Sequence, residues 1–154
     1  MDDRNWMMLL SEEHQVGRVM KTNQYTEQFG LRLSEREATE LVRERIEVLQ
    51  EQQRVEFRQG ILEKLIFAFC DSAYIQQNDY AETIGRLQEI FYLYKNESLD
   101  EWTDDELISL MRNAFEEECQ GSLDYLEETY LEYFSRKVRS GNRGLTGREN
   151  EDEV

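Results

Sequence analysis

The chain has 154 residues and no proline, and charged residues make up 34% of it, with a net charge of -16. This length suits one domain with its own core, and a proline-free, charge-rich composition is typical of long helices. So negative a chain repels nucleic-acid backbones and anionic lipid, and we therefore expect neither a nucleic acid nor a membrane as its partner.

Residues 1–20 are predicted to form an N-terminal extension that is partly helical, as one or two short pieces. An apolar cluster at residues 6–10 is too short for a signal peptide and follows the acidic residues Asp2 and Asp3. Such a cluster docks on the chain's own domain, pairs with a second subunit or binds a partner. We favour docking on the domain, because exposed apolar clusters are rare on monomers.

Two helix boundaries are predicted in the next stretch. Tyr25 and Phe29 are four residues apart, and Gly30 follows them as at the C-terminal cap of a short helix. Ser34 and Glu37 form a capping box, after which apolar residues recur at helical spacing to about residue 53. We therefore expect a short helix that ends at Gly30 and a long helix directly after Ser34.

Residues 61–70 (ILEKLIFAFC) are the most apolar run of the chain, interrupted only by Glu63 and Lys64. A helix that is apolar nearly all round is a buried helix, and this run is far shorter than the roughly 20 residues that cross a bilayer. We therefore predict that it is the hub of the core. Replacing either Phe67 or Phe69 with alanine should then cost about 3–5 kcal/mol.

Three further helices are predicted towards the C-terminus. The first starts near Asn78 or Asp79, the second at a capping box of Thr103 and Glu106, and the third at Ser122. Each has one apolar face, made of Tyr80, Ile84, Leu87, Phe91 and Tyr94, then of Leu107, Ile108, Leu110, Met111, Ala114 and Phe115, and then of Leu123, Leu126, Tyr130, Tyr133, Phe134 and Val138. All three faces can close on the helix at 61–70.

Together these elements predict an all-α fold, a single-domain helical bundle of five or six helices around the buried central helix at 61–70. The all-helical domain is expected to span residues 21–139, and the glycine-rich and charged residues 140–154 to form a flexible tail. The two cysteines, Cys70 and Cys119, lack the spacing of a disulfide framework or a zinc site. This indicates a reducing compartment, and we expect a cytoplasmic protein.

Residues 60–108 and 119–132 carry a resemblance to known sequences, above all through the strings FCDSAY at 69–74 and KNESLD at 95–100. From about Lys21 to Arg139 the chain resembles an uncharacterised family, a domain of unknown function, of small helical proteins from anaerobic Gram-positive bacteria. The resemblance implies a bacterial, cytoplasmic protein. It supplies no catalytic residue.

The negative charge is concentrated in residues 97–132, which contain 13 acidic residues and one basic residue, Arg112. A basic protein, a polyamine or a cation matches such a surface electrostatically. The candidate interaction surface consists of Asp104, Asp105, Glu116, Glu117, Asp124, Glu127 and Glu128.

The sequence predicts no metal site and no cofactor. His14 is the only histidine, which excludes the carboxylate-histidine sites of four-helix bundles. A zinc site of Cys70, Cys119 and His14 would lack the close cysteine pair of structural zinc sites. Consecutive carboxylates such as those at 116–118 point to different sides of a helix, so they do not converge on a cation.

Cys119 is the candidate reactive thiol, because the following helix N-terminus would lower its pKa. The neighbouring carboxylates at 116–118 raise that pKa, and no histidine base is near in sequence, so buried packing is favoured instead. Seven tyrosines either line a ligand cleft or bury their rings at the core boundary, and we favour the second. They are Tyr74, Tyr80, Tyr92, Tyr94, Tyr125, Tyr130 and Tyr133.

No phosphate-binding glycine loop and no nucleophile elbow occurs, so an enzyme is not favoured. The favoured function is a non-catalytic interaction protein that presents its acidic helical surface to an unidentified protein partner, for which a basic protein is the best electrostatic match. One alternative is a small ligand-binding domain or enzyme with an aromatic and carboxylate cleft. Another is an acidic mimic of nucleic acid, and the sequence leaves the oligomeric state open.

Overall fold

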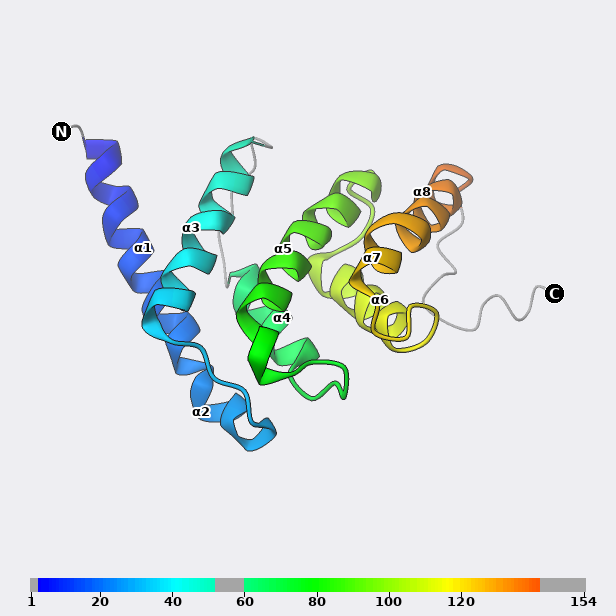
Figure 1. Cartoon of the computed structure of the whole chain (residues 1–154). Helices are drawn as coiled ribbons and strands as arrows, with labels where there is room; N and C mark the ends of the chain where they lie inside the picture. Colours follow the sequence, from blue (N-terminus) through cyan, green and yellow to red (C-terminus); the bar gives the residue numbers. More distant parts are fainter. Residues whose placement is uncertain (1–2, 52–59, 142–154) are drawn as a thin grey trace. The chain divides into compact units, whose positions relative to one another are not determined.

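The computed structural model describes residues 3–51 and 60–141, with side chains for 12–47, 49–50 and 60–141. In this part of the chain the regular elements are helices, and no strand occurs (Figure 1). The longer helices are α1 (Asp3–Lys21), α3 (Glu35–Glu51), α4 (Ile61–Phe69), α5 (Tyr80–Glu97), α6 (Asp104–Glu116) and α8 (Leu131–Arg139), and the short ones are α2 (Asn23–Thr26) and α7 (Leu123–Tyr125). The predicted all-α helical bundle is confirmed.

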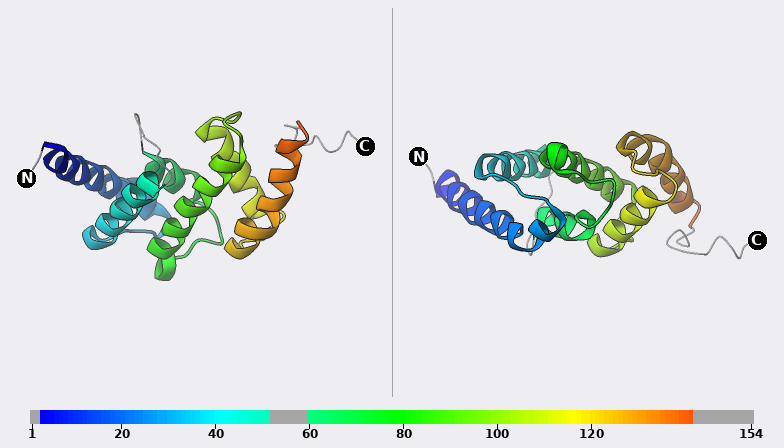
Figure 2. Two further views of the ribbon diagram at one scale, coloured as in Figure 1. Left: turned by 90° about the horizontal axis from the view of Figure 1, so that it is seen from above. Right: turned by 60° about the horizontal axis from the view of Figure 1, so that its bottom comes forward.

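The helices group into two compact units, of which the first ends at Gln88 and the second begins at Glu89. Helix α5 therefore contributes to both. In the first unit α1 contacts α3, α2 and α4, and both views of Figure 2 show α1 and α3 side by side. The apolar side chains that form its core come from all of its longer helices and from the segment before α3, and include Val19, Leu31, Leu33, Leu41, Val42, Leu65, Ile66, Phe69 and Ile84.

The predicted boundaries around Gly30 and Ser34 are confirmed. Gly30 follows a 3-10 turn at Glu27–Phe29 and has a φ of 79°, the left-handed conformation that glycine adopts without strain. The Ser34 backbone N–H donates to Glu37 Oε1 at 2.9 Å, and the Glu37 N–H donates to Ser34 Oγ at 3.1 Å. Both halves of the capping box are thus formed. The N-terminal stretch forms the single helix α1 rather than two short pieces.

Helix α4 is the predicted central helix, and five of its apolar side chains are almost completely buried, namely Ile61, Leu62, Leu65, Ile66 and Phe69. The prediction that Phe67 lies in the core is wrong, because this side chain is 45% exposed. Phe67 lies one turn after Glu63 and Lys64 on the same side of the helix. Glu63 forms an ion pair with Arg18 at 2.6 Å and is buried. The apolar pattern of the sequence does not predict that a charged side chain is buried here.

Helix α5 begins after a 3-10 turn at Gln77–Asp79 and carries the predicted stripe. All five side chains of that stripe are buried, as is Ile90. Gly85 lies on the side of α5 that faces α3. A Cβ at this position would lie 3.2 Å from Glu44 Oε1 and 3.4 Å from Leu41 Cδ2, so the glycine allows α3 to come close to α5.

In the second unit, α6 contacts a π-helical turn at Leu126–Tyr130, which connects α7 to α8. The core here includes Phe91, Tyr94, Trp102, Leu107, Met111, Phe115, Leu126 and Phe134. The sequence predicts one regular helix after Ser122, whereas the π-helical turn adds a residue to one turn and shifts the later side chains around the axis. As a result Tyr133 is only half-buried, while Ser135 is buried. Leu123, which comes before this turn, is half-buried as well.

Two predicted segments lie outside the described residues. These are residues 55–59, for which the sequence predicts a turn or an extended link, and the tail, of which only Ser140 and Gly141 directly after α8 are described. The division into an extension at 1–20, a domain at 21–139 and a tail at 140–154 stays a prediction.

Candidate functional site

Acidic side chains dominate the solvent-facing side of the second unit. Of the 13 acidic residues within 97–132, nine are exposed, four are half-exposed and none is buried. The local sequence accounts for this, since the buried positions of α6 are all apolar and the charged positions of α6 and α8 fall on the other faces. The carboxylates of residues 97–132 are therefore presented to solvent.

Two of the candidate residues, Asp104 and Asp105, lie in the first turn of α6. The helix begins with the predicted capping box, in which the Glu106 N–H donates to Thr103 Oγ1 at 3.1 Å and the Thr103 N–H donates to Glu106 Oε1 at 2.9 Å. Carboxylates in the first turn are stabilised by the helix dipole. Lys95 Nζ donates to Asp104 Oδ1 at 2.6 Å, which neutralises part of the charge at this end.

The other five candidate carboxylates flank the turn between α6 and α7. This turn is fixed by backbone hydrogen bonds from the Cys119 N–H to the Ala114 carbonyl and from the Gly121 N–H to the Phe115 carbonyl, both 2.8 Å. Gly121 has a φ of 84°. The next helix starts where Ser122 Oγ accepts a hydrogen bond from the Tyr125 N–H at 3.1 Å. We call Glu116, Glu117, Asp124, Glu127 and Glu128 the α6–α7 acidic group.

The seven candidate residues fall into two sets, one at each end of α6. A helix rises 1.5 Å per residue, so Asp104 and Glu116 lie roughly 18 Å apart along the axis of α6. The structure brings five of the candidates to one turn and leaves Asp104 and Asp105 at the opposite end of α6. The sequence does not distinguish these two sets, because it shows only that all seven belong to one acidic stretch.

Ion pairs offset part of the negative charge. They join Lys95 to Asp104, Arg112 to Glu116, Arg136 to Glu132 and Arg139 to Glu97, with distances between 2.6 and 3.9 Å. Arg112 is the one basic residue within 97–132, against 13 acidic residues, so the formal charge of this stretch is -12. A negative potential therefore remains over the second unit.

The candidate thiol of Cys119 is buried, with 5% of the residue exposed. Burial, followed by the nearby charge of Glu118, raises its pKa to about 11. At neutral pH the group is therefore a protonated thiol, which is a poor nucleophile. The structure supports the packing interpretation of this residue.

The tyrosines lie mainly in the core. Tyr80, Tyr92, Tyr94 and Tyr130 are buried, Tyr133 is half-buried, and Tyr74 and Tyr125 are exposed. Burial raises the pKa of Tyr80 to about 12 and raises that of Tyr94 as well. The Tyr94 hydroxyl donates to the Leu126 carbonyl at 2.6 Å within the second unit. These contacts support packing at the core boundary rather than a ligand cleft.

The sequence does not predict a second exposed feature, an aromatic cluster of Tyr25, Phe29 and Phe67 on the first unit. These side chains are 48%, 39% and 45% exposed. The Tyr25 ring lies edge-on to Phe29 at 5.7 Å and to Phe67 at 5.6 Å between ring centroids. Lys64, three residues before Phe67 and partly exposed, is the signal that could have indicated the exposed side of α4.

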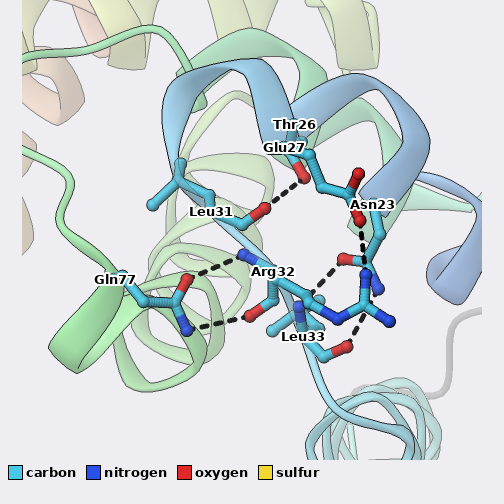
Figure 3. A network of polar contacts seen from close by, with 7 residues as sticks. All are labelled: Asn23, Thr26, Glu27, Leu31, Arg32, Leu33 and Gln77. Carbon is cyan, nitrogen blue, oxygen red and sulfur yellow. Dashed lines mark hydrogen bonds and ion pairs between the residues drawn. The ribbon is translucent and has the colours of Figure 1, made fainter.

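Figure 3 shows the polar network that holds the segment carrying Tyr25 and Phe29. Asn23 makes two hydrogen bonds with the Leu33 backbone, as acceptor from its N–H at 2.8 Å and as donor to its carbonyl at 2.9 Å. Gln77 binds the Arg32 backbone in the same way, at 2.7 and 3.1 Å. Thr26 Oγ1 donates to the Leu31 carbonyl at 2.9 Å. The backbone N–H and carbonyl groups of residues 31–33 thereby find side-chain partners, where a β-strand would find them in a neighbouring strand.

Within the residues whose side chains are described, no three or more histidine, cysteine or acidic side chains form a group that could hold a metal ion. The same part of the chain has no helix with the length and apolar content needed to span a bilayer.

Comparison with known proteins gives one match. A family of unknown function, DUF6323, matches residues 18–144. No curated protein and no solved structure matches the chain.

Proposed function

The chain belongs to the DUF6323 family of unknown function, and from its own residues we propose that it is a non-catalytic interaction protein that binds a basic protein through the acidic surface of its second unit. The observation that carries the proposal is that none of the 13 carboxylates within 97–132 is buried. The α6–α7 acidic group is the centre of the proposed surface, because five carboxylates flank one hydrogen-bonded turn there.

Electrostatics supports a basic protein as the partner. Exposed carboxylates attract basic surfaces over roughly a Debye length, raise association rates and discriminate against acidic competitors. They bind more weakly as salt rises. Backbone hydrogen bonds from Cys119 and Gly121 fix the turn between α6 and α7. The backbone that carries the surrounding carboxylates therefore has a defined conformation before a partner binds.

The reducing bacterial cytoplasm is the proposed location. Cys70 and Cys119 are both buried and form no disulfide with each other, which suits a compartment in which thiols stay reduced. Because burial keeps the Cys119 thiol protonated at neutral pH, the proposal gives this residue no catalytic role.

Affinity isolation from cells of the native source tests the proposal. The bait is the full chain, and its acidic variant replaces Glu117, Glu127 and Glu128 with glutamine and Asp124 with asparagine. The matched control replaces four exposed residues of the first unit with glutamine, namely Glu13, Glu40, Glu47 and Glu82. Both variants change the net charge by the same amount, so only the position of the charge differs.

We expect a basic protein that is retained by the wild type and by the control at low salt, lost by the acidic variant, and released as salt rises. Retention of the same protein by the acidic variant would refute the proposed surface. If the two variants lose the partner to the same degree, net charge alone is responsible and the α6–α7 acidic group is not a specific site.

A further inference from the structure

The aromatic cluster of Tyr25, Phe29 and Phe67 consists of three large, partly exposed side chains that lie next to one another on the first unit. Side chains of this size bury 150–250 Å² each when covered, so the exposed fractions correspond to roughly 250 Å² for the three together. The Tyr25 ring contacts both of the others edge-on, and the three rings therefore form one continuous patch. The largest contiguous apolar patch on a typical monomer covers roughly 300–600 Å² and is often functional, so a patch of roughly 250 Å² is the size of a small docking site.

The patch is held on rigid parts of the first unit. Phe67 projects from α4, whose opposite side is buried in the core. Tyr25 and Phe29 lie on α2 and the 3-10 turn after it, and the buried side chains of Asn23 and Thr26 tie this segment to residues 31–33 (Figure 3). Rings that are already fixed lose little entropy when a ligand covers them.

The size and charge of the patch indicate what covers it. A stable protein–protein interface buries about 800 Å² on each partner, which is roughly three times the area of the cluster. A second copy of this chain would also bring a further net charge of -16 against the first, and that repulsion opposes self-association. A short segment needs less area, since one or two apolar side chains can supply most of its binding energy.

We propose that the aromatic cluster is a docking site for a short apolar segment of another protein, which places an aliphatic or aromatic side chain against the rings of Tyr25 and Phe67. This site lies on the first unit and is independent of the acidic surface proposed above. Its binding rests on burial of apolar area, so it should depend only weakly on salt.

Selection from a phage-displayed library of short random peptides against the full chain tests the proposal. The enriched peptide is then labelled with fluorescein, and its affinity is measured by fluorescence anisotropy at low and at high salt. Three variants are compared with the wild type, namely Phe29→Gln, the double variant Tyr25→Ala with Phe67→Ala, and Tyr125→Ala. Tyr125 is the matched control, because it is an aromatic side chain of similar exposure, 41%, on the second unit.

We expect peptides that share apolar anchors, a loss of affinity of about tenfold or more in the double variant, and a change within about twofold in Tyr125→Ala. Phe29→Gln should weaken binding severalfold, and it replaces an exposed ring in a turn, so it keeps the test informative if the double variant does not fold. The acidic variant described above should bind the peptide as the wild type does.

Three results would overturn the proposal. They are the absence of any enriched peptide, equal affinity of the enriched peptide for the wild type and both cluster variants, and a dimer in sedimentation that dissociates when Tyr25 and Phe67 are replaced. The last result would assign the patch to a second copy of the chain.

Discussion

The hydroxyl group of Tyr94 donates a hydrogen bond of 2.6 Å to the main-chain carbonyl of Leu126. Both residues are completely buried, and Leu126 is the first residue of the π-helical turn. Side-chain insertion into the hydrogen-bond ladder is one of the recognised causes of irregular helix turns. The contact therefore ties α5 to the irregular turn that follows the α6–α7 acidic group.

Tyr94→Phe should lower the free energy of unfolding by about 1–2 kcal/mol, because a buried carbonyl loses a partner while the ring stays in place. Equilibrium unfolding in urea measures the effect. The control is Tyr125→Phe, which removes the same hydroxyl from an exposed ring and should change stability by less than about 0.5 kcal/mol. Equal stability of the two variants would show that the Tyr94 bond contributes nothing net.

Phe69→Ala and Phe67→Ala should differ strongly in stability although the residues are two positions apart on α4. Phe69 is 0% exposed, and its truncation should cost about 3–5 kcal/mol. Phe67 is 45% exposed and contacts the exposed ring of Tyr25, so its truncation should cost about 1 kcal/mol or less. Thermal and urea unfolding of both variants test this, and similar losses would mean that the sequence prediction for Phe67 was right after all.

The contrast between these two phenylalanines shows how far sequence reasoning reaches. The capping boxes at Ser34 and Thr103 are local, with both partners within one turn, and they are predicted correctly. The direction in which an almost wholly apolar helix faces is a non-local property. For α4 it depends on Arg18, which lies far away in sequence and pairs with Glu63.

The candidate site shows the same division. Exposure of the acidic residues is predictable, because charged side chains are seldom fully buried. Separation of Asp104 from the α6–α7 acidic group follows from the length of α6. The π-helical turn at Leu126 is not predictable from spacing, since its hydrogen bond comes from Tyr94 on another helix. The aromatic cluster likewise joins Tyr25 to Phe67 from separate elements.

Asn23→Ala should destabilise the chain by about 2–4 kcal/mol, since it leaves the buried N–H and carbonyl of Leu33 without their partners. Gln77→Ala is the matched control. It removes the same pair of hydrogen bonds from the Arg32 backbone, but at an exposed position where water replaces them, so the expected loss is below about 1 kcal/mol. Urea unfolding compares the two variants. A larger loss of stability for Gln77→Ala would contradict the conclusion that the Leu33 backbone is buried and the Arg32 backbone exposed.

Gly60→Ala tests the close packing at the N-terminus of α4. Gly60 has backbone angles that alanine adopts readily, but a Cβ there would lie 2.8 Å from Glu63 Oε1. The carboxylate would have to move away from Arg18, with which it forms the 2.6 Å pair, and we expect a loss of about 1–2 kcal/mol.

Gly17→Ala is the control for this substitution. Gly17 lies within α1, and nothing is within 4 Å of a Cβ placed there, so helix propensity alone predicts a gain of about 0.5–1 kcal/mol. Opposite signs for the two glycine substitutions in urea unfolding are the expected result. A gain for both would show that the Glu63 side chain moves without loss.

The raised pKa of Cys119 predicts how stability depends on alkaline pH. The folded thiol has a pKa of about 11 against an ordinary value of 9.0, so the unfolded state releases its proton first as pH rises. Stability should therefore fall as pH rises from about 9 to about 11, by about 1–2 kcal/mol from this group. Below pH 9 both states keep the proton, and Cys119 adds no pH dependence.

The measurement is urea unfolding of the wild type and of Cys119→Ala at several values between pH 8 and pH 11. The variant loses packing at every pH, so the informative quantity is the slope, which should be flatter in the variant above pH 9. In a Cys70→Ala background, the remaining Cys119 thiol should also react with a disulfide reagent at pH 8 at least about tenfold more slowly than free cysteine. Parallel slopes together with rapid labelling would mean that Cys119 is an accessible thiolate, which would restore the reactive-thiol hypothesis.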